Sequence, residues 1–215
     1  MNYDVLEQIS QGGRTPQDTE IIRIAAIVDE LQRVCRVHAP QSRTGKENDF
    51  ALEVEQRAAE KWAKENRCWL PISDVLELGY PGPSGNENDT YVDEKENVVY
   101  KVNNLFNSGS IIAHLKKIII HNTLFPETAY TFHCFAGMEG RSVLPVFKQK
   151  WVSNARPATQ IMIDTYLTAI GFEKTDTEGS FRNATFEAWD LVPRNVLVDN
   201  DGDIYIVDAE IKQIQ

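Results

Sequence analysis

The fold is decided by the stretch Asp190-Leu191-Val192-Pro193-Arg194-Asn195-Val196-Leu197-Val198 and the residues that follow it to Asp208. The runs 196–198 and 204–207 are apolar, and Asp-Gly stands in the turn between them, a pattern that predicts a β-hairpin. An antiparallel hairpin brings its outer ends together, so we expect Asn195 and Asp208 to lie within a few ångströms of each other. Asp190 should enter this corner from the preceding loop.

A corner lined by carboxylate and amide oxygens suits Mg²⁺, which prefers one or two such ligands together with substrate phosphates. Asn195 and Asp208 are therefore candidate metal ligands, and Asp190 is a candidate base beside a transferred phosphate. A structural interpretation remains open, in which Asp190 caps a local turn and Asn195 satisfies backbone groups. We do not expect a calcium loop over 199–210, because its glycine stands at the fourth place rather than the sixth.

Short strands around a glycine and proline loop are expected upstream of this corner. In chain order, the predicted elements are a strand at Val75–Leu78, the loop Gly79–Gly85, a strand at Thr90–Asp93, a turn at Glu94–Asn97 and a strand at Val98–Val102. The last of these strands carries Lys101. A lysine on an antiparallel sheet often faces solvent, so Lys101 alone would indicate no function.

Helices and further strands complete the region between Lys101 and the hairpin. The predicted elements are a helix over 108–122 capped by Ser108 or Ser110, strands at Ala129–Phe135 and Val143–Val152, and a helix over Thr159–Ile170 that stops at Gly171. The expected class is therefore α+β.

In this order of elements, residues 75–210 resemble the protein kinase superfamily. The stretch 190–198 is similar to the kinase catalytic loop, in which Asp190 would receive the substrate hydroxyl proton and Asn195 would hold a metal ion. Asp208 stands where the family has its metal-binding Asp. More narrowly, Glu55 to Trp69 followed by this core resembles the kinase-like module of polyvalent proteins from bacterial mobile elements.

The resemblance also implies a nucleotide site. Lys101 matches the lysine that contacts the α and β phosphates, and Gly82 and Gly85 lie in the place of the phosphate-covering loop. ATP and Mg²⁺ are the implied cofactors. The implied fold is a small antiparallel N-lobe sheet with one helix, followed by a truncated, mainly helical C-lobe that carries the catalytic-loop hairpin.

Several positions depart from the family pattern. Ala188-Trp189 and Ala209-Glu210 replace the usual His-Arg and Phe-Gly, and the predicted helix over 108–122 contains no Glu to pair with Lys101. Pro81 and Pro83 stiffen the glycine loop and remove two N–H donors. Only 215 − 208 = 7 residues follow Asp208, so we expect no activation segment or peptide-substrate platform in this chain.

Two amphipathic helices are expected before residue 70. Thr15 and Pro16 are typical of a helix start, and an apolar stripe from Ile21 to Cys35 follows them. The second helix is predicted from Asp49 to about Asn66, after a loop over Pro40–Asn48. We therefore expect residues 1–70 to form a helical extension, which could dock on the core or on a protein partner, and 71–215 to form the kinase-like domain.

Composition excludes several other classes of protein. The formal charge is 22 − 32 = −10, so binding of nucleic acid or of an anionic membrane by bulk charge is not expected. No apolar run approaches the roughly 20 residues of a membrane span. The three cysteines, Cys35, Cys68 and Cys134, form no Cys-x-x-Cys pair, and the four histidines lack zinc-ligand spacing. We expect a cytoplasmic globular protein.

Two functions of different classes follow from these features. The first is an ATP- and Mg²⁺-dependent phosphotransferase whose phosphoryl acceptor the sequence does not name. The alternative is a catalytically inactive pseudokinase that binds nucleotide or a protein partner, as the missing Glu indicates. Either function is also compatible with a segment of a longer polyvalent polyprotein.

Overall fold

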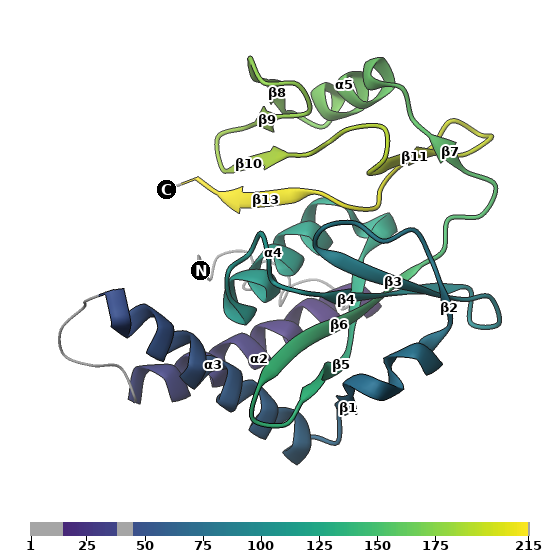
Figure 1. Cartoon of the computed structure of the whole chain (residues 1–215). Helices are drawn as coiled ribbons and strands as arrows, with labels where there is room; N and C mark the ends of the chain where they lie inside the picture. Colours follow the sequence, from purple (N-terminus) through teal and green to yellow (C-terminus); the bar gives the residue numbers. More distant parts are fainter. Residues whose placement is uncertain (1–14, 38–44, 215) are drawn as a thin grey trace. The chain divides into compact units, whose positions relative to one another are not determined.

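The structure, a computed structural model, describes residues 15–37 and 45–214. Two compact units divide the chain, and each is described by itself (Figure 1). The first, which we call the sheet unit, comprises residues 1–119 and 130–149, and the second, the hairpin unit, comprises 120–129 and 150–215. Both combine helices with strands, which confirms the predicted α+β class.

A six-stranded sheet organises the sheet unit. In spatial order its strands are β1 (Trp69–Pro71), β5 (Tyr130–Met138), β6 (Ser142–Lys150), β4 (Val98–Asn103), β3 (Asn88–Asp93) and β2 (Tyr80–Pro81). The β2–β3, β3–β4 and β5–β6 pairs are antiparallel, but β1 runs parallel to β5, with Trp69 opposite Phe135. The expectation of a wholly antiparallel sheet was wrong at β1, because a three-residue strand is too short to show an alternating pattern.

The 3₁₀ helix η1 (Ile72–Leu78) occupies the place of the first predicted strand. Val75 is buried, Leu78 is half-buried, and Leu76 between them is 68% exposed. Side chains three residues apart align in a 3₁₀ helix, so this segment buries one side without any ladder. The strand prediction for Val75–Leu78 was therefore wrong, since so short an apolar run is ambiguous between helix and strand.

Helix α2 (Pro16–Val37) begins at the predicted cap. The Thr15 side-chain oxygen accepts the N–H of Asp18 at 3.1 Å, and the Asp18 carboxylate accepts the N–H of Thr15 at 2.9 Å. This reciprocal pair satisfies two amide groups at the helix start, where no intrahelical acceptor exists. The stripe from Ile21 to Leu31 is buried, as its spacing predicted.

Helix α3 (Gly45–Glu65) begins four residues before the predicted Asp49. The first part of the predicted loop Pro40–Asn48 lies outside the described residues, and residues 45–48 belong to the helix instead. This part of the loop prediction was wrong because Lys46, Glu47 and Asn48 give the first turn no apolar stripe.

The two N-terminal helices dock on the strands of their own unit. Glu20 of α2 accepts the N–H of Phe132 at 2.7 Å, and Arg23 donates to the carbonyl oxygen of the same residue at 3.0 Å. The register of β5 against β6 shifts just after Phe132. A bulge leaves backbone groups without ladder partners, and here α2 supplies both partners.

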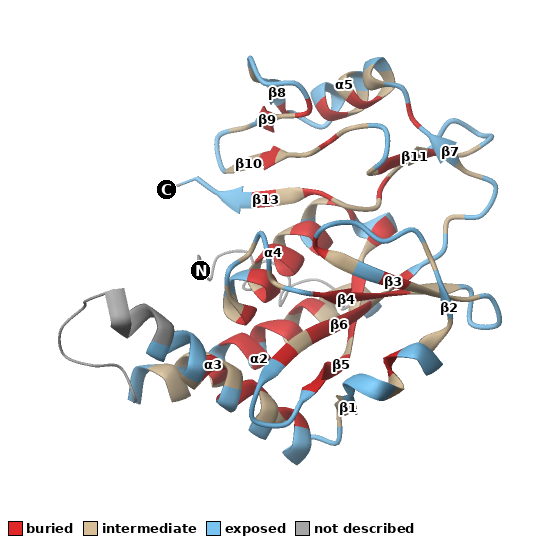
Figure 2. Cartoon of the chain, viewed as in Figure 1, coloured by how far each residue is buried: buried red, intermediate tan, exposed pale blue. Residues whose placement is uncertain are grey.

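One hydrophobic core joins these helices to the sheet and to α4 (Ile111–Leu124), as the continuous buried faces in Figure 2 indicate. Its largest fully buried members are Ile21, Ile24, Ile27, Leu31, Ile111, Leu115, Phe132, Phe135 and Phe147. The predicted domain boundary at residue 70 stays a prediction, and the packing shows that α2 and α3 belong to the same core as the strands.

The hairpin unit is built mainly from short strands. It contains η2 (Pro126–Thr128), β7 (Arg156–Pro157), α5 (Gln160–Ala169), β8 (Glu173–Lys174), β9 (Phe181–Arg182), β10 (Phe186–Trp189), β11 (Val196–Val198), β12 (Ile204–Ile206) and β13 (Glu210–Gln213). The strands of this unit form two sheets, with the spatial orders β13-β10-β9-β8 and β12-β11-β7. The expectation of a mainly helical region was wrong for the described residues, because strands of two to four residues leave no readable periodicity.

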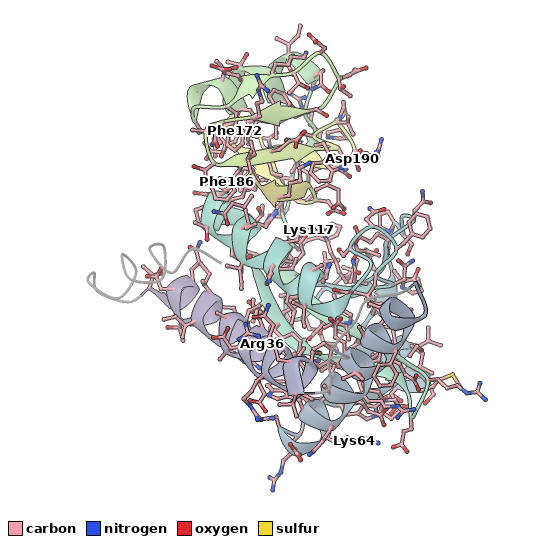
Figure 3. All side chains as sticks on the ribbon, turned by 90° about the vertical axis from the view of Figure 1, so that its left-hand side faces the viewer. Arg36, Lys64, Lys117, Phe172, Phe186 and Asp190 are labelled. Carbon is pink, nitrogen blue, oxygen red and sulfur yellow. The ribbon has the colours of Figure 1, made fainter. Side chains whose placement is uncertain are left out.

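The core of the hairpin unit closes around α5, whose first turn is capped by the Thr159 side chain and which is followed by Gly171 at φ 90°, where the sequence predicted its end. Phe172 is buried and Phe186 packs against the same core from β10 (Figure 3). No helix within the described ranges is long and apolar enough to cross a membrane.

Candidate functional site

The predicted hairpin brings Asn195 and Asp208 together. Strands β11 and β12 pair antiparallel, with Val196 opposite Ile206. At their outer end, the carbonyl oxygen of Asn195 accepts the N–H of Val207 at 3.0 Å and that of Asp208 at 3.3 Å. The two candidate metal ligands are therefore adjacent, as the hairpin geometry requires.

Asp190 is tied to the same corner by the side chain of Asn195. The Asn195 amide nitrogen donates to both the carbonyl oxygen and a carboxylate oxygen of Asp190, each at 2.8 Å. The other carboxylate oxygen accepts from Arg194. Asp190 adopts φ 60°, a left-handed conformation that Asp tolerates better than most residues. The Asn195 bonds therefore hold an unusual backbone conformation that orients the Asp190 carboxylate.

The donor set of this corner fits a hard cation. Because Nδ2 of Asn195 is committed to Asp190, Oδ1 is the atom that Asn195 could offer to a metal, and Asp208 adds a carboxylate. Two oxygen ligands suit Mg²⁺, which takes its remaining ligands from water and phosphates. Within 15–37 and 45–214, no group of three or more His, Cys, Asp or Glu could hold a metal ion by itself.

Other acids of the hairpin turn have structural roles. One oxygen of Asp199 accepts the N–H groups of Asp201 and Asp203, both at 3.0 Å, and the other accepts from the Tyr205 hydroxyl at 3.0 Å. Glu210 lies in β13 opposite Trp189 of β10. This arrangement is a side-chain-stabilised turn followed by a strand.

Lys101 lies in the sheet unit and is buried rather than solvent-facing, with only 9% of its surface exposed. Its ammonium donates to the hydroxyl of Tyr130 on β5 at 3.0 Å and lies 4.9 Å from the centre of the Tyr130 ring. Burial of a lysine is costly unless polar or charged groups compensate it. The burial and the contacts of Lys101 are therefore those of a lysine with a functional or structural role. The strand pattern alone could not show that this side chain is buried.

A buried acid in this unit escaped the sequence reasoning. Glu87, between the glycine loop and β3, forms an ion pair with Lys117 of α4 at 3.1 Å, and both side chains are less than 10% exposed. Asn107 and Ser108 also donate to Glu87, at 3.1 and 3.3 Å. Lys117 is labelled on α4 in Figure 3. No sequence signal separates Glu87 from its exposed acidic neighbours, because only the fold buries it.

His114 lies inside this network as a neutral imidazole. Its Nδ1 lies 3.3 Å from the Ser108 hydroxyl and 3.9 Å from the Glu87 carboxylate. Burial, followed by the positive charge of Lys117, lowers the pKa of His114 to about 3, although Glu87 opposes the shift and Lys101 adds to it. The histidine therefore contributes a hydrogen bond rather than a charge at neutral pH.

The predicted glycine loop contains β2, and its second half, residues 82–85, leads from β2 toward β3. The N–H of Gly82 donates to Thr90 at 2.8 Å and that of Gly85 to Asn88 at 3.0 Å. A Cβ on Gly82 would lie 2.7 Å from the Thr90 hydroxyl, so close packing favours glycine there. The backbone amides of both glycines thus donate to residues of the same hairpin, and the role of Gly82 and Gly85 in nucleotide binding stays a prediction.

A mixed α+β fold with a buried strand lysine and an Asp, Asn and Asp hairpin corner is compatible with a kinase-like domain. A family model described as the serine/threonine/tyrosine kinase found in polyvalent proteins matches residues 53–215, which is more than half of the chain. The chain therefore belongs to this family. No curated protein matches it.

Proposed function

We propose that the chain binds ATP with Mg²⁺ and transfers the terminal phosphoryl group to a hydroxyl acceptor. Lys101 would contact the nucleotide phosphates, Asn195 and Asp208 would hold the metal ion, and Asp190 would orient the acceptor hydroxyl. The observation that carries this proposal is the position of Asn195, whose side-chain amide donates to the Asp190 carboxylate while its backbone carbonyl oxygen accepts the N–H of Asp208. Membership of the kinase family supports the same assignment.

The chemistry expected of these residues is positioning and charge compensation. Mg²⁺, when bound, neutralises charge that develops on the transferred phosphates. The lysine ammonium supplies a further positive charge, and Asp190 accepts a hydrogen bond from the acceptor hydroxyl. In this proposal the sheet unit corresponds to the small lobe of a kinase and the hairpin unit to a shortened large lobe.

Calorimetric titration of the full chain with a non-hydrolysable ATP analogue tests the proposal, with and without Mg²⁺. We expect Lys101→Met and Asp208→Ala each to weaken binding about tenfold or more, the second only when Mg²⁺ is present. Asp201→Ala is the matched control, because Asp201 is an exposed acid in the turn of the same hairpin. Absence of binding by the unaltered chain, or equal loss in Asp201→Ala, would show that the site is assigned wrongly.

A pseudokinase is the second candidate. Helix α4 places Lys117, rather than the acid expected in a kinase, in the buried network. Glu210, which follows Asp208 where the family has its Asp-Phe-Gly, is paired in a strand. Phosphorylation assays with the chain itself, generic proteins and small alcohols separate the two candidates when binding is measured in parallel. Nucleotide binding without any transfer would favour the pseudokinase. A protein partner of the N-terminal helices would fit either candidate.

A further inference from the structure

The backbone next to Asp190 is anchored by residues that lie outside the hairpin corner. The N–H of Leu191 donates to the carbonyl oxygen of Gly179 at 3.0 Å, and the carbonyl oxygen of Leu191 accepts from Nε2 of Gln160 at 3.2 Å. The Leu191 side chain is fully buried in the core of the hairpin unit. Both polar backbone groups and the side chain of the residue after Asp190 are therefore held in place.

Gln160 is the first residue of α5, and its amide nitrogen makes a second hydrogen bond. Nε2 also donates to Oδ1 of Asp164, one turn further along the helix, at 2.9 Å. The other carboxylate oxygen of Asp164 accepts from Lys174 of β8. Although burial opposes the shift, the hydrogen bonds from Lys174 and Gln160 lower the pKa of Asp164, so its carboxylate stays charged at neutral pH. A primary amide has two N–H donors, so the bond to Asp164 fixes the direction of the bond to Leu191.

Gly179 anchors Leu191 from the loop between β8 and β9. It has φ 70°, a conformation that glycine adopts without steric cost. A Cβ on Gly179 would lie 2.8 Å from a methyl carbon of Val192 and 3.2 Å from the carbonyl oxygen of Leu191. The absence of a side chain at Gly179 thus permits the close approach that its hydrogen bond with Leu191 requires.

These contacts fix the backbone conformation on which the direction of the Asp190 carboxylate depends. The peptide between Asp190 and Leu191 is planar, so its carbonyl oxygen and its N–H point in linked directions. Asn195 donates to that carbonyl oxygen at 2.8 Å, and Gly179 accepts from that N–H. Asp190 has φ 60°, a conformation that persists only where the surrounding structure holds it. Gln160 holds the following peptide, so the loop is restrained on both sides of Leu191.

We propose that Gln160 is a positioning residue for Asp190: by holding the carbonyl oxygen of Leu191, it fixes the loop so that the Asp190 carboxylate meets the acceptor hydroxyl. This inference rests on the proposed phosphoryl transfer and adds to it a residue from another element of the hairpin unit. A displacement of about 1 Å at a reacting group is enough to slow a reaction about 100-fold. A small shift of this loop should therefore slow transfer and leave ATP affinity unchanged.

The test compares Gln160→Met, which keeps the length of the side chain but removes both donors, with Gln213→Met, the same change at an exposed position of β13. Transfer is measured to water, as inorganic phosphate released from Mg·ATP. The water oxygen bonds the terminal phosphorus, the bond from that phosphorus to ADP breaks, and Asp190 takes the proton. We expect kcat of Gln160→Met to fall about 3- to 10-fold with KM for ATP within about twofold, and Gln213→Met to match the unaltered chain.

Two further measurements separate positioning from a loss of folded protein. Calorimetric titration with a non-hydrolysable ATP analogue gives the number of binding sites per chain, which should be unchanged in Gln160→Met. In the double variant Gln160→Met/Asp190→Asn, the loss of Gln160 should cause no further fall in kcat, because Gln160 acts through Asp190.

An unchanged kcat in Gln160→Met, or a fall in kcat matched by an equal fall in the number of binding sites, would overturn the positioning role alone. A full further loss of kcat in the double variant would do the same. An unaltered chain that binds no ATP, or that binds ATP and releases no phosphate, would overturn the proposed transfer and the role of Gln160 together.

Discussion

The Glu87–Lys117 network and the Asp190–Asn195–Asp208 corner are built in opposite ways. The network is buried, with the Lys117 side chain 8% exposed, and it joins Glu87 in one loop and Asn107 and Ser108 in another to helix α4. The corner is more open, with the Asp190 side chain 39% exposed, and the hydrogen bonds that join Asp190, Asn195 and Asp208 to one another lie within residues 190–208.

This difference in burial determines how much the loss of one charged partner destabilises the folded state. In a buried network each charged group depends on its partner, because water cannot replace a lost ion pair. In a more exposed corner, water can solvate a charge that has lost its partner. The same kind of substitution therefore changes the chemistry of the site far more than the free energy of unfolding. We therefore expect variants of the network to unfold the protein and variants of the corner to leave it folded.

Lys117→Met should have the largest effect. It leaves the Glu87 carboxylate without its main positive partner, and breaking a buried pair in this way costs about 3–5 kcal/mol. Urea denaturation followed by circular dichroism measures the change in the free energy of unfolding. Lys116→Met, next to it on α4 but only half-buried, is the control and should lose less than about 1 kcal/mol.

The double variant Glu87→Gln/Lys117→Met sharpens this prediction. Removing both charges should recover a large part of the stability, because no uncompensated charge remains. Equal losses in Lys117→Met and Lys116→Met would mean that the network contributes no more than the helix surface.

Protonation of His114 should have the second-largest effect on the free energy of unfolding. Its pKa is about 3 in the folded chain and near 6.5 in the unfolded chain, so the unfolded state binds the proton more tightly. Its contribution to stability is full above pH 6.5 and is lost as the pH falls toward 3. Between pH 6.5 and 5 we expect a loss of about 1.5 kcal/mol.

His114→Gln should remove that pH dependence whatever its absolute stability. The measurement is the slope of unfolding free energy against pH, and His133→Gln is the comparison. His133 is half-buried, and burial lowers its pKa as well, so we expect its replacement to change the slope less. An unaltered slope in His114→Gln would contradict a neutral buried imidazole.

Glu55→Ala should have a smaller effect, about 1 kcal/mol. Its carboxylate accepts the first amides of α4, from Ile111 at 2.5 Å and Ile112 at 3.3 Å, and thus acts as a capping group from another helix. Glu53→Ala, whose carboxylate pairs with exposed Arg57, is the control and should change stability by less than about 0.5 kcal/mol.

The pH dependence of Glu55 has the opposite sign to that of His114. Burial raises its pKa, although the amides of Ile112 and Ile111 oppose the shift. The folded state then binds this proton more tightly, so its contribution falls as the pH rises above the ordinary carboxyl value of 4.5. Glu55→Gln should flatten this part of the profile, and a profile that stays unchanged would refute the assignment.

Asp190→Asn should have the smallest effect on stability, less than about 0.5 kcal/mol. Asn tolerates the positive φ and can still accept from Asn195, while the pair with Arg194 is exposed. Phosphoryl transfer, where the unaltered chain shows it, should fall at least about 100-fold. Substantial unfolding of Asp190→Asn would make the corner a structural element and would remove the contrast with the buried network.

The corner could be predicted from sequence because its contacts are local. The turn at 199–202 and the alternation of β11 and β12 are sufficient to place Asn195 beside Asp208, and the spacing from Asp190 is set by one loop. The strands β8, β9 and β13 were missed because two to four residues carry too little periodicity. The 3₁₀ helix at 72–78 was mistaken for a strand for the same reason.

The sequence by itself determined the hairpin corner, the strand that carries Lys101 and the resemblance to kinases, because each depends on neighbouring residues. Only the tertiary structure decided which acid is buried, since Glu87 and Lys117 are 30 residues apart and meet through packing. The same holds for Tyr130 beside Lys101 and for Glu55 at the start of α4. Long-range contacts select a few polar residues from many similar ones, and no local pattern records that selection.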